Sequence, residues 1–293
     1  MEMEATSSDI VIQRSLNDKC EKLEDLLQGD VIFIRAPMRF EIDDLVRQEV
    51  ENLATSGTQR NMLAVVLETN GGFVEVVERI SEVFRHHYEK VIFVVPNAAY
   101  SAGTVLALSG DAIYMDYYSV LGPIDPQIMS VEGRIVPAIG YLEEYEKLLA
   151  KSRDQSICEA EMHILLNKFD PATLFVVQQA KEHSAKLIER WLCEYKFRDW
   201  DTTMTDKTKR AREIAEILGN PKRWNSHGRG IPMRILETKE INLRINDFGS
   251  NPELKKAIRE YYALFIDYCG KYNTRSAVHT KNRFYRLGEA YEN

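Results

Sequence analysis

The first half of the chain alternates short, nearly unbroken apolar segments with segments of helical spacing. The apolar segments are residues 30–36, 62–69, 90–96 and 112–116. The segments of helical spacing are residues 40–57 and 74–89. Strands that are apolar on both faces are typical of a parallel sheet covered by helices. The pattern therefore predicts an α/β fold with a mostly parallel sheet.

The second half predicts mainly helices. Residues 170–197 form the clearest one, with Asp170 placed as N-cap and Pro171 at the first helical position. We expect three parts in the chain, listed here as an N-terminal arm, a central domain and a C-terminal helix with a polar tail: 1–29, 30–248 and 249–293. The tail after residue 274 is basic and polar, and we expect it to be mobile or bound to a partner.

Charge and composition exclude several classes of protein. The formal net charge is −7, which argues against a general binder of nucleic acids or anionic membranes. The four cysteines form no pair with metal-ligand spacing, so we expect reduced thiols, no bound metal and no cofactor. No run of about 18 apolar residues occurs, and the sequence predicts a cytoplasmic protein without an integral membrane segment.

Two strand ends carry residues that suit acyl-transfer chemistry. The second strand is followed by TNGG (69–72) and the third by NAAYSAG (97–103). In an open parallel sheet, ligands bind beyond the carboxyl ends of the strands. Gly71 and Gly72 would let a substrate carbonyl lie against backbone N–H groups, and Ser101 would attack that carbonyl. The plain alternatives are an ordinary glycine turn and a serine that caps a helix.

Taken together, the two motifs resemble those of the ClpP/crotonase superfamily. Within this superfamily, the chain is most similar to the signal-peptide-peptidase-A-like branch called the serine dehydrogenase proteinases, in the segments LETNGG, NAAYSAGTVLALSGDAIYMDYYSVLGPIDPQ and SHGRGIPMRILETKEINLRIND. The resemblance covers about residues 28–248, and 62–127 is its most specific part. It implies a ClpP/crotonase-like fold of repeated β-β-α and βα units, a helical C-terminal half and a serine peptidase that forms homo-oligomers.

The resemblance also implies roles for individual residues. Ser101 would be the nucleophile, and the amides of Gly71 and Gly72, with or without Ala102, would form the oxyanion hole. The family pattern usually has a proline where this chain has Asn70, and this change should loosen the turn without removing a catalytic group.

The general base is less clearly indicated. A ClpP-like triad would place a histidine near residues 121–127, and none is present; the later histidines are His163, His183 and His227. The signal-peptide-peptidase-A-like enzymes instead use a Ser-Lys dyad, with the lysine near the start of a long helix. Lys168 fits that place best, and the alternatives are Lys151, Lys147, Lys186 and His183.

The interpretation is a serine peptidase that acts on peptides or proteins and needs no ATP for the cleavage itself. A crotonase-type acyl-CoA hydratase or hydrolase is the second hypothesis, although SAGTVLALSG lacks the glutamates that such enzymes usually carry. The third is a catalytically degenerate oligomeric scaffold. Residues 261–268 carry many apolar and aromatic side chains, from which we also predict a homo-oligomer.

Overall fold

The computed structural model describes residues 6–57, 59–129 and 135–287. Its centre is a seven-stranded sheet with the order β10-β5-β3-β2-β1-β11-β12. The first five of these strands are parallel, and β11 and β12 are antiparallel to their neighbours. The sheet strands are β1 (Asp30–Arg35), β2 (Met62–Glu68), β3 (Lys90–Val94), β5 (Ala112–Met115), β10 (Asn246–Asp247), β11 (Ser276–Thr280) and β12 (Arg283–Leu287).

Alternating side chains of the strands fill two separate cores. On β1, Ile32 and Ile34 belong to one core and Val31 and Phe33 to the other, and all four are fully buried. This two-sided burial confirms the predicted α/β fold, and the predicted strands at 30–36, 62–69, 90–96 and 112–116 correspond to β1, β2, β3 and β5.

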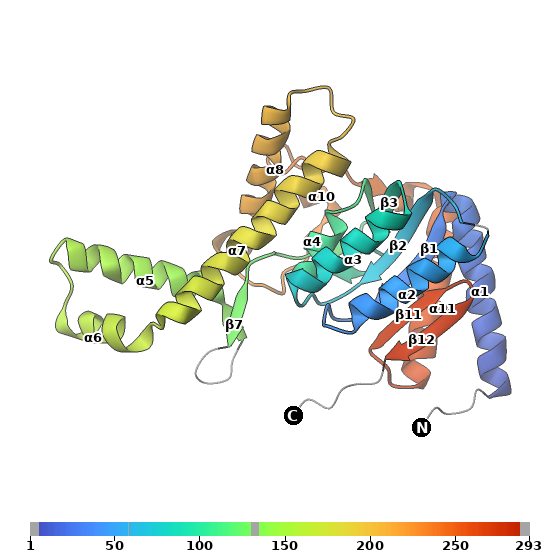
Figure 1. Ribbon diagram of the computed structural model, residues 1–293, viewed down its shortest axis with the longest axis horizontal. Helices are drawn as coiled ribbons and strands as arrows, with labels where there is room; N and C mark the ends of the chain where they lie inside the picture. Colours follow the sequence, from blue (N-terminus) through green and yellow to red (C-terminus); the bar gives the residue numbers. More distant parts are fainter. Residues whose placement is uncertain (1–5, 58, 130–134, 288–293) are drawn as a thin grey trace.

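Helices cover both faces of the sheet (Figure 1). The first core contains side chains from α2 (Ile42–Thr55), α3 (Val74–His87), α4 (Ala102–Ala107) and α7 (Pro171–Trp191), and from residues between 192 and 245 of the second half. The second core contains side chains from α1 (Ser7–Leu27) and α11 (Pro252–Lys271), together with Phe248. Asp170 caps α7 as predicted, because its carboxylate accepts hydrogen bonds from the N–H groups of Ala172 and Thr173.

The remaining elements lie in the second half and around the smaller sheets. Figure 1 shows α5 and α6 standing away from the main sheet. The small sheets are β4-β6-β9 and β7-β8. The bounds of these elements are β4 (Ala98–Ala99), β6 (Val120–Leu121), β7 (Gln127–Met129), β8 (Ile135–Pro137), α5 (Ala138–Arg153), α6 (Glu159–Lys168), the π-helix η1 (Leu192–Lys196), α8 (Met204–Leu218), α9 (Pro221–Trp224), β9 (Ile231–Pro232), α10 (Met233–Leu236) and the 3-10 helix η2 (Phe248–Ser250).

Both terminal segments belong to the core. On α1, Leu16, Cys20 and Leu23 are fully buried against the face that α11 also covers. The expectation of a mobile or partner-bound tail after residue 274 is wrong for residues 276–287, because β11 pairs with β1 and β12 pairs with β11. Residues 288–293 of that tail lie outside the described residues.

The apolar face of residues 261–268 has a partner within the chain. Tyr261 and Phe265 are fully buried, Tyr268 is 2% exposed, and all three pack in the second core against the sheet. The argument for a homo-oligomer from this segment is therefore wrong, and the oligomer itself stays a prediction. None of the helices in the described residues combines the length and the apolar character that crossing a lipid bilayer requires.

The buried histidine of β11 gives a pH-dependent stability. His279 is fully buried, with Nδ1 2.5 Å from the Tyr261 hydroxyl and Nε2 3.1 Å from Asn17 Oδ1. Burial lowers the pKa of His279 from 6.5 to about 3. Between these two values the unfolded chain binds a proton that the folded chain excludes, so the free energy of unfolding falls as the pH drops below 6.5.

The expected slope from His279 is up to about 1.4 kcal/mol per pH unit. Urea unfolding at a series of pH values between 7 and 4 should show a smaller slope for His279→Gln than for the parent chain. His163 is exposed on α6, so His163→Gln is the matched control and should keep the parent slope. Equal slopes for the parent chain and His279→Gln would contradict the prediction.

Candidate active site

Ser101 occupies a strained turn between β4 and α4. Its backbone angles are φ 52° and ψ −120°, which lie outside the regions that residues with a side chain normally adopt. Although Ser101 is the N-cap of α4, its side chain makes no capping hydrogen bond, and we find no partner for the hydroxyl in the described residues. Backbone strain of this kind concentrates at functional sites. The strained turn at Ser101 holds a half-buried hydroxyl that makes no hydrogen bond within the described residues.

The glycine turn after β2 lies directly against Ser101. Thr69 bridges to Ala99, and the Tyr100 N–H donates to the Thr69 carbonyl at 2.9 Å. Gly71 has φ 95°, and a Cβ added there would lie 2.7 Å from Ser101 Cβ. Gly72 has φ 146°, and a Cβ there would lie 2.3 Å from the Met38 carbonyl oxygen. Both positions therefore need glycine for the close approach as well as for the backbone angles.

The backbone amides around Ser101 differ in their hydrogen bonds. The Gly71 N–H donates to Thr69 Oγ1 at 3.0 Å, so Gly71 shapes the turn and its amide is occupied. For the amides of Gly72 and Ala102, no acceptor is found within the part of the chain that the structure describes. Gly72 is exposed, and Ala102 directly follows the serine. Two amides without a partner, one in the glycine turn and one directly after the serine, suit the stabilisation of an oxyanion.

A histidine and a carboxylate contact each other near one end of the strands of the small sheet β4-β6-β9. His227 Nδ1 lies 3.0 Å from Asp125 Oδ1, and the side chains are 17% and 1% exposed. The second carboxylate oxygen, Asp125 Oδ2, is buried and finds no hydrogen-bond partner among the described residues. Because Nδ1 faces the carboxylate, Nε2 is the ring nitrogen left for a substrate or a nucleophile.

The register of the small sheet places this pair on the same side as Ser101. Ala99 of β4 pairs with Leu121 of β6, and Leu121 pairs with Ile231 of the antiparallel β9. Ser101 follows Ala99, Asp125 follows Leu121, and His227 precedes Ile231, so all three leave the sheet at one edge. Since adjacent strands lie about 4.8 Å apart, β4, which precedes Ser101, and β9, which follows His227, are separated by about 10 Å.

Thr104 connects the serine helix to the segment that carries Asp125. Its hydroxyl donates to the Gly122 carbonyl at 2.9 Å, and the Gly122 N–H is 2.9 Å from the same hydroxyl oxygen. Gly122 also allows close packing, since a Cβ there would lie 2.4 Å from Tyr100 Cδ1. These contacts fix the position of α4 relative to the turn at residues 122–126.

Three of the lysines predicted as bases lie on α5 and α6, and the fourth, Lys186, lies on α7 with its Nζ 3.8 Å from Glu182. Lys168 is the last residue of α6 and is exposed. Lys147 is 3.2 Å from Glu144, and Lys151 forms an ion pair with Glu161. The hydrogen bond to Glu161 raises the pKa of Lys151. A lysine that accepts a proton from serine needs a lowered pKa instead. The arrangement gives no support to the predicted Ser-Lys dyad, which stays a prediction.

Two more side chains could act as a general base: His183, which the sequence predicts as an alternative, and Lys196. His183 Nε2 on α7 lies 3.3 Å from Glu78 of α3. Lys196 on η1 has its pKa lowered by burial to about 8, which would suit a base. Its neighbour is Asp111, and Asp111 precedes β5, at the edge of the main sheet opposite to the carboxyl ends of the strands. Lys196 is therefore on the wrong side of the sheet to serve Ser101.

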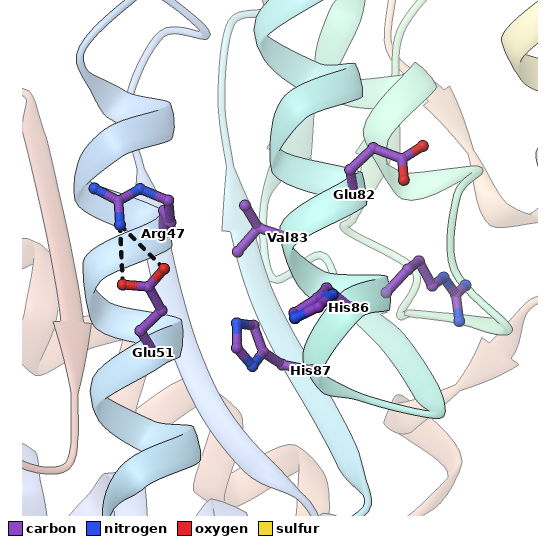
Figure 2. A pocket seen from close by; sticks show the side chains of 7 residues that line it. Arg47, Glu51, Glu82, Val83, His86 and His87 are labelled. Carbon is purple, nitrogen blue, oxygen red and sulfur yellow. Dashed lines mark hydrogen bonds and ion pairs between the residues drawn. The ribbon is translucent and has the colours of Figure 1, made fainter.

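One hollow on the surface does not include Ser101 in its lining. It has a volume of about 530 Å³ between α2 and α3, and its lining includes Arg47, Glu51, His86 and His87 (Figure 2). Arg47 and Glu51 pair with each other at 2.9 Å across this surface. Among the residues that the structure describes, no three His, Cys, Asp or Glu side chains gather as metal ligands. The absence of a metal stays a prediction.

A mostly parallel sheet with a strained serine and a glycine turn beyond the carboxyl ends of its strands is the arrangement that the resemblance to ClpP-like proteins predicts. The sequence profile of the ClpP-like SDH-type serine proteinases matches residues 41–264, about three quarters of the chain. The chain belongs to this family, and its fold is the ClpP-like fold predicted from the sequence.

Individual relatives are more distant. Two uncharacterised proteins of Methanocaldococcus jannaschii are 27% identical over 184 residues and 28% identical over 217 residues. The first match covers 62% of this chain and 51% of the relative, and the second covers 73% and 63%. The chain thus spans between half and two thirds of the length of these curated relatives.

Two solved structures also align with the chain. A membrane-bound stomatin-specific protease gives a TM-score of 0.45 at 14% identity, covering 75% of this chain and 79% of the protease. ClpP1 from Listeria monocytogenes gives a TM-score of 0.38 at 12% identity, covering 76% of this chain and 93% of ClpP1.

Proposed function

We propose that this chain hydrolyses peptide bonds through Ser101, with His227 as general base and Asp125 as the group that orients it. The observation that carries the proposal is the Ser101 turn, where a strained backbone holds a hydroxyl without a partner against the glycine turn. Membership of a serine proteinase family supports the same chemistry. The base is assigned from the 3.0 Å contact between His227 and Asp125 at the same sheet edge.

The proposed reaction follows from these positions. Ser101 Oγ attacks the scissile carbonyl carbon while its proton passes to His227 Nε2, and the carbonyl oxygen becomes an oxyanion between the amides of Gly72 and Ala102. The protonated imidazole then gives its proton to the leaving amine as the C–N bond breaks. A water molecule releases the acyl group from Ser101 by the same steps.

Asp125 has a positioning role in this scheme. Its carboxylate accepts the Nδ1–H of His227, which holds the ring in the tautomer whose Nε2 accepts a proton. Asp125 is 1% exposed, its Oδ1 contacts His227 Nδ1, and its Oδ2 finds no hydrogen-bond partner among the described residues. The positive charge that forms on the imidazole during the reaction would lie against this carboxylate.

A fluorophosphonate probe tests the nucleophile directly. We expect the probe to phosphonylate the parent chain, and mass spectrometry of the digested protein should place the adduct on Ser101. Ser152 lies on α5, so Ser152→Ala is the control and should react like the parent chain. An unlabelled parent chain, or an adduct on another residue, would overturn the proposal. Thermal stabilisation by coenzyme A without labelling would favour the crotonase-type hypothesis.

A further inference from the structure

Two exposed phenylalanines pack against each other on the surface. Phe40 is 57% exposed and Phe73 is 51% exposed, and their ring centroids are 5.5 Å apart with the ring planes tilted by 32°. Single exposed apolar residues are common, but a pair of large aromatic side chains that stay in water together marks a binding surface.

The backbone places this pair beside the proposed oxyanion hole. The Met38 N–H donates to the Gly71 carbonyl at 2.8 Å, and the Phe73 N–H donates to the Met38 carbonyl at 2.7 Å. The segment after β1 is thereby bonded to the glycine turn. Phe73 directly follows Gly72, and Phe40 comes two residues after Met38. A peptide whose carbonyl oxygen lies at the Gly72 amide must pass close to both rings.

The segment that carries Phe40 is also strained. Glu41 has φ 90° and ψ −34°, a conformation that residues with a side chain rarely adopt. The next residue, Ile42, is 3% exposed and packs in the first core. The strained turn thus separates a buried Ile42 from an exposed Phe40. Strained residues persist where the surrounding structure needs them, and they cluster at binding sites.

We propose that the Phe40–Phe73 pair is an apolar subsite that binds an aliphatic or aromatic side chain of the peptide next to the scissile bond. This inference rests on the proposed function, since it places the substrate carbonyl at Gly72. The side chain would cover both ring faces and remove them from water, which favours apolar over polar residues at one position of the substrate. Hydrophobic subsites of this kind favour the better-fitting substrate side chain over a poorer one by about tenfold or more.

Binding to the Ser101→Ala chain tests the subsite without turnover. Fluorescein-labelled peptides, each with Leu or Gln at one scanned position, are titrated and their fluorescence anisotropy is measured. We expect one position at which Leu binds about tenfold more tightly than Gln. In the same background, Phe40→Ser with Phe73→Ser should reduce this preference to less than about twofold.

The matched control is another exposed phenylalanine. Phe175 on α7 is 65% exposed, and Phe175→Ser should keep the full preference for Leu. The subsite is overturned if the preference survives the double substitution, or if no scanned position shows one. Failure of the hydrolytic proposal is seen separately, as a parent chain that fluorophosphonate does not label; the anisotropy result then still decides whether the two rings select an apolar side chain.

Discussion

Replacing Ser101 with alanine is expected to reduce peptide hydrolysis by a factor of about 10³ to 10⁶, because removal of a catalytic nucleophile leaves only binding and the oxyanion donors. The fold should be nearly unaffected. The Ser101 hydroxyl has no hydrogen-bond partner in the described residues, so its loss should change the free energy of unfolding by less than about 0.5 kcal/mol. An internally quenched peptide and urea unfolding measure the two quantities.

A second substitution at the same position separates catalysis from strain. Glycine adopts φ 52° without the steric penalty that alanine and serine carry. Ser101→Gly should therefore be as inactive as Ser101→Ala but more stable, by about 1 kcal/mol. If Ser101→Ala hydrolyses the peptide at the parent rate, the proposal of a peptidase is wrong. If Ser101→Gly is no more stable than Ser101→Ala, the inference of backbone strain at this position is wrong.

The sheet was predictable from the sequence because its strands are apolar on both faces. In β1 the successive residues Val31, Ile32, Phe33 and Ile34 are all buried, so no polar alternation obscures the segment. The two C-terminal strands were not predictable in this way. β11, β12 and the turn between them contain the polar residues His279, Lys281 and Arg283, and the place of the two strands depends on the pairing of β11 with β1.

The helix α11 shows a second structural feature that the sequence alone does not determine. An apolar stripe along residues 261–268 indicates that the helix is buried, but it does not identify what buries it. We predicted another copy of the chain, whereas Tyr261 and Phe265 pack against Phe33 of β1. Burial within a chain and burial between chains need the same side chains, so the choice between them requires the path of the backbone.

The candidate site was predictable where its parts lie close together in the sequence. Gly71, Gly72 and Ser101 follow two adjacent strands, and each is part of a short recognisable motif. His227 lies 102 residues from Asp125 and reaches it through β9, a strand of two residues. Such a strand has no hydrophobic period. The available signals were the rigid turn GPIDP beside the site and a histidine in the glycine-containing loop NSHGRGIP.

Substitution of His227 and Asp125 should decide the identity of the base. His227→Gln is expected to lower kcat/KM by about 10³ or more, and Asp125→Asn by about 10² to 10⁴, because the amide no longer fixes the tautomer of the imidazole. The double variant should be no slower than His227→Gln alone by more than a few fold, since residues that act as one unit are not additive. Urea unfolding of each variant checks that the buried position of Asp125 tolerates the change.

The lysines provide the opposing test in the same assay. Lys168→Ala, Lys151→Ala and Lys147→Ala should each keep kcat/KM within about twofold of the parent, because Lys168 and Lys147 are exposed and Lys151 is held by Glu161. His183→Gln should behave like them, since His183 contacts Glu78 of α3. A loss of activity in Lys168→Ala together with full activity in His227→Gln would restore the Ser-Lys dyad. In that case the Asp125–His227 pair would serve to join the turn after β6 to the segment that leads into β9, and its substitution would lower stability rather than the rate.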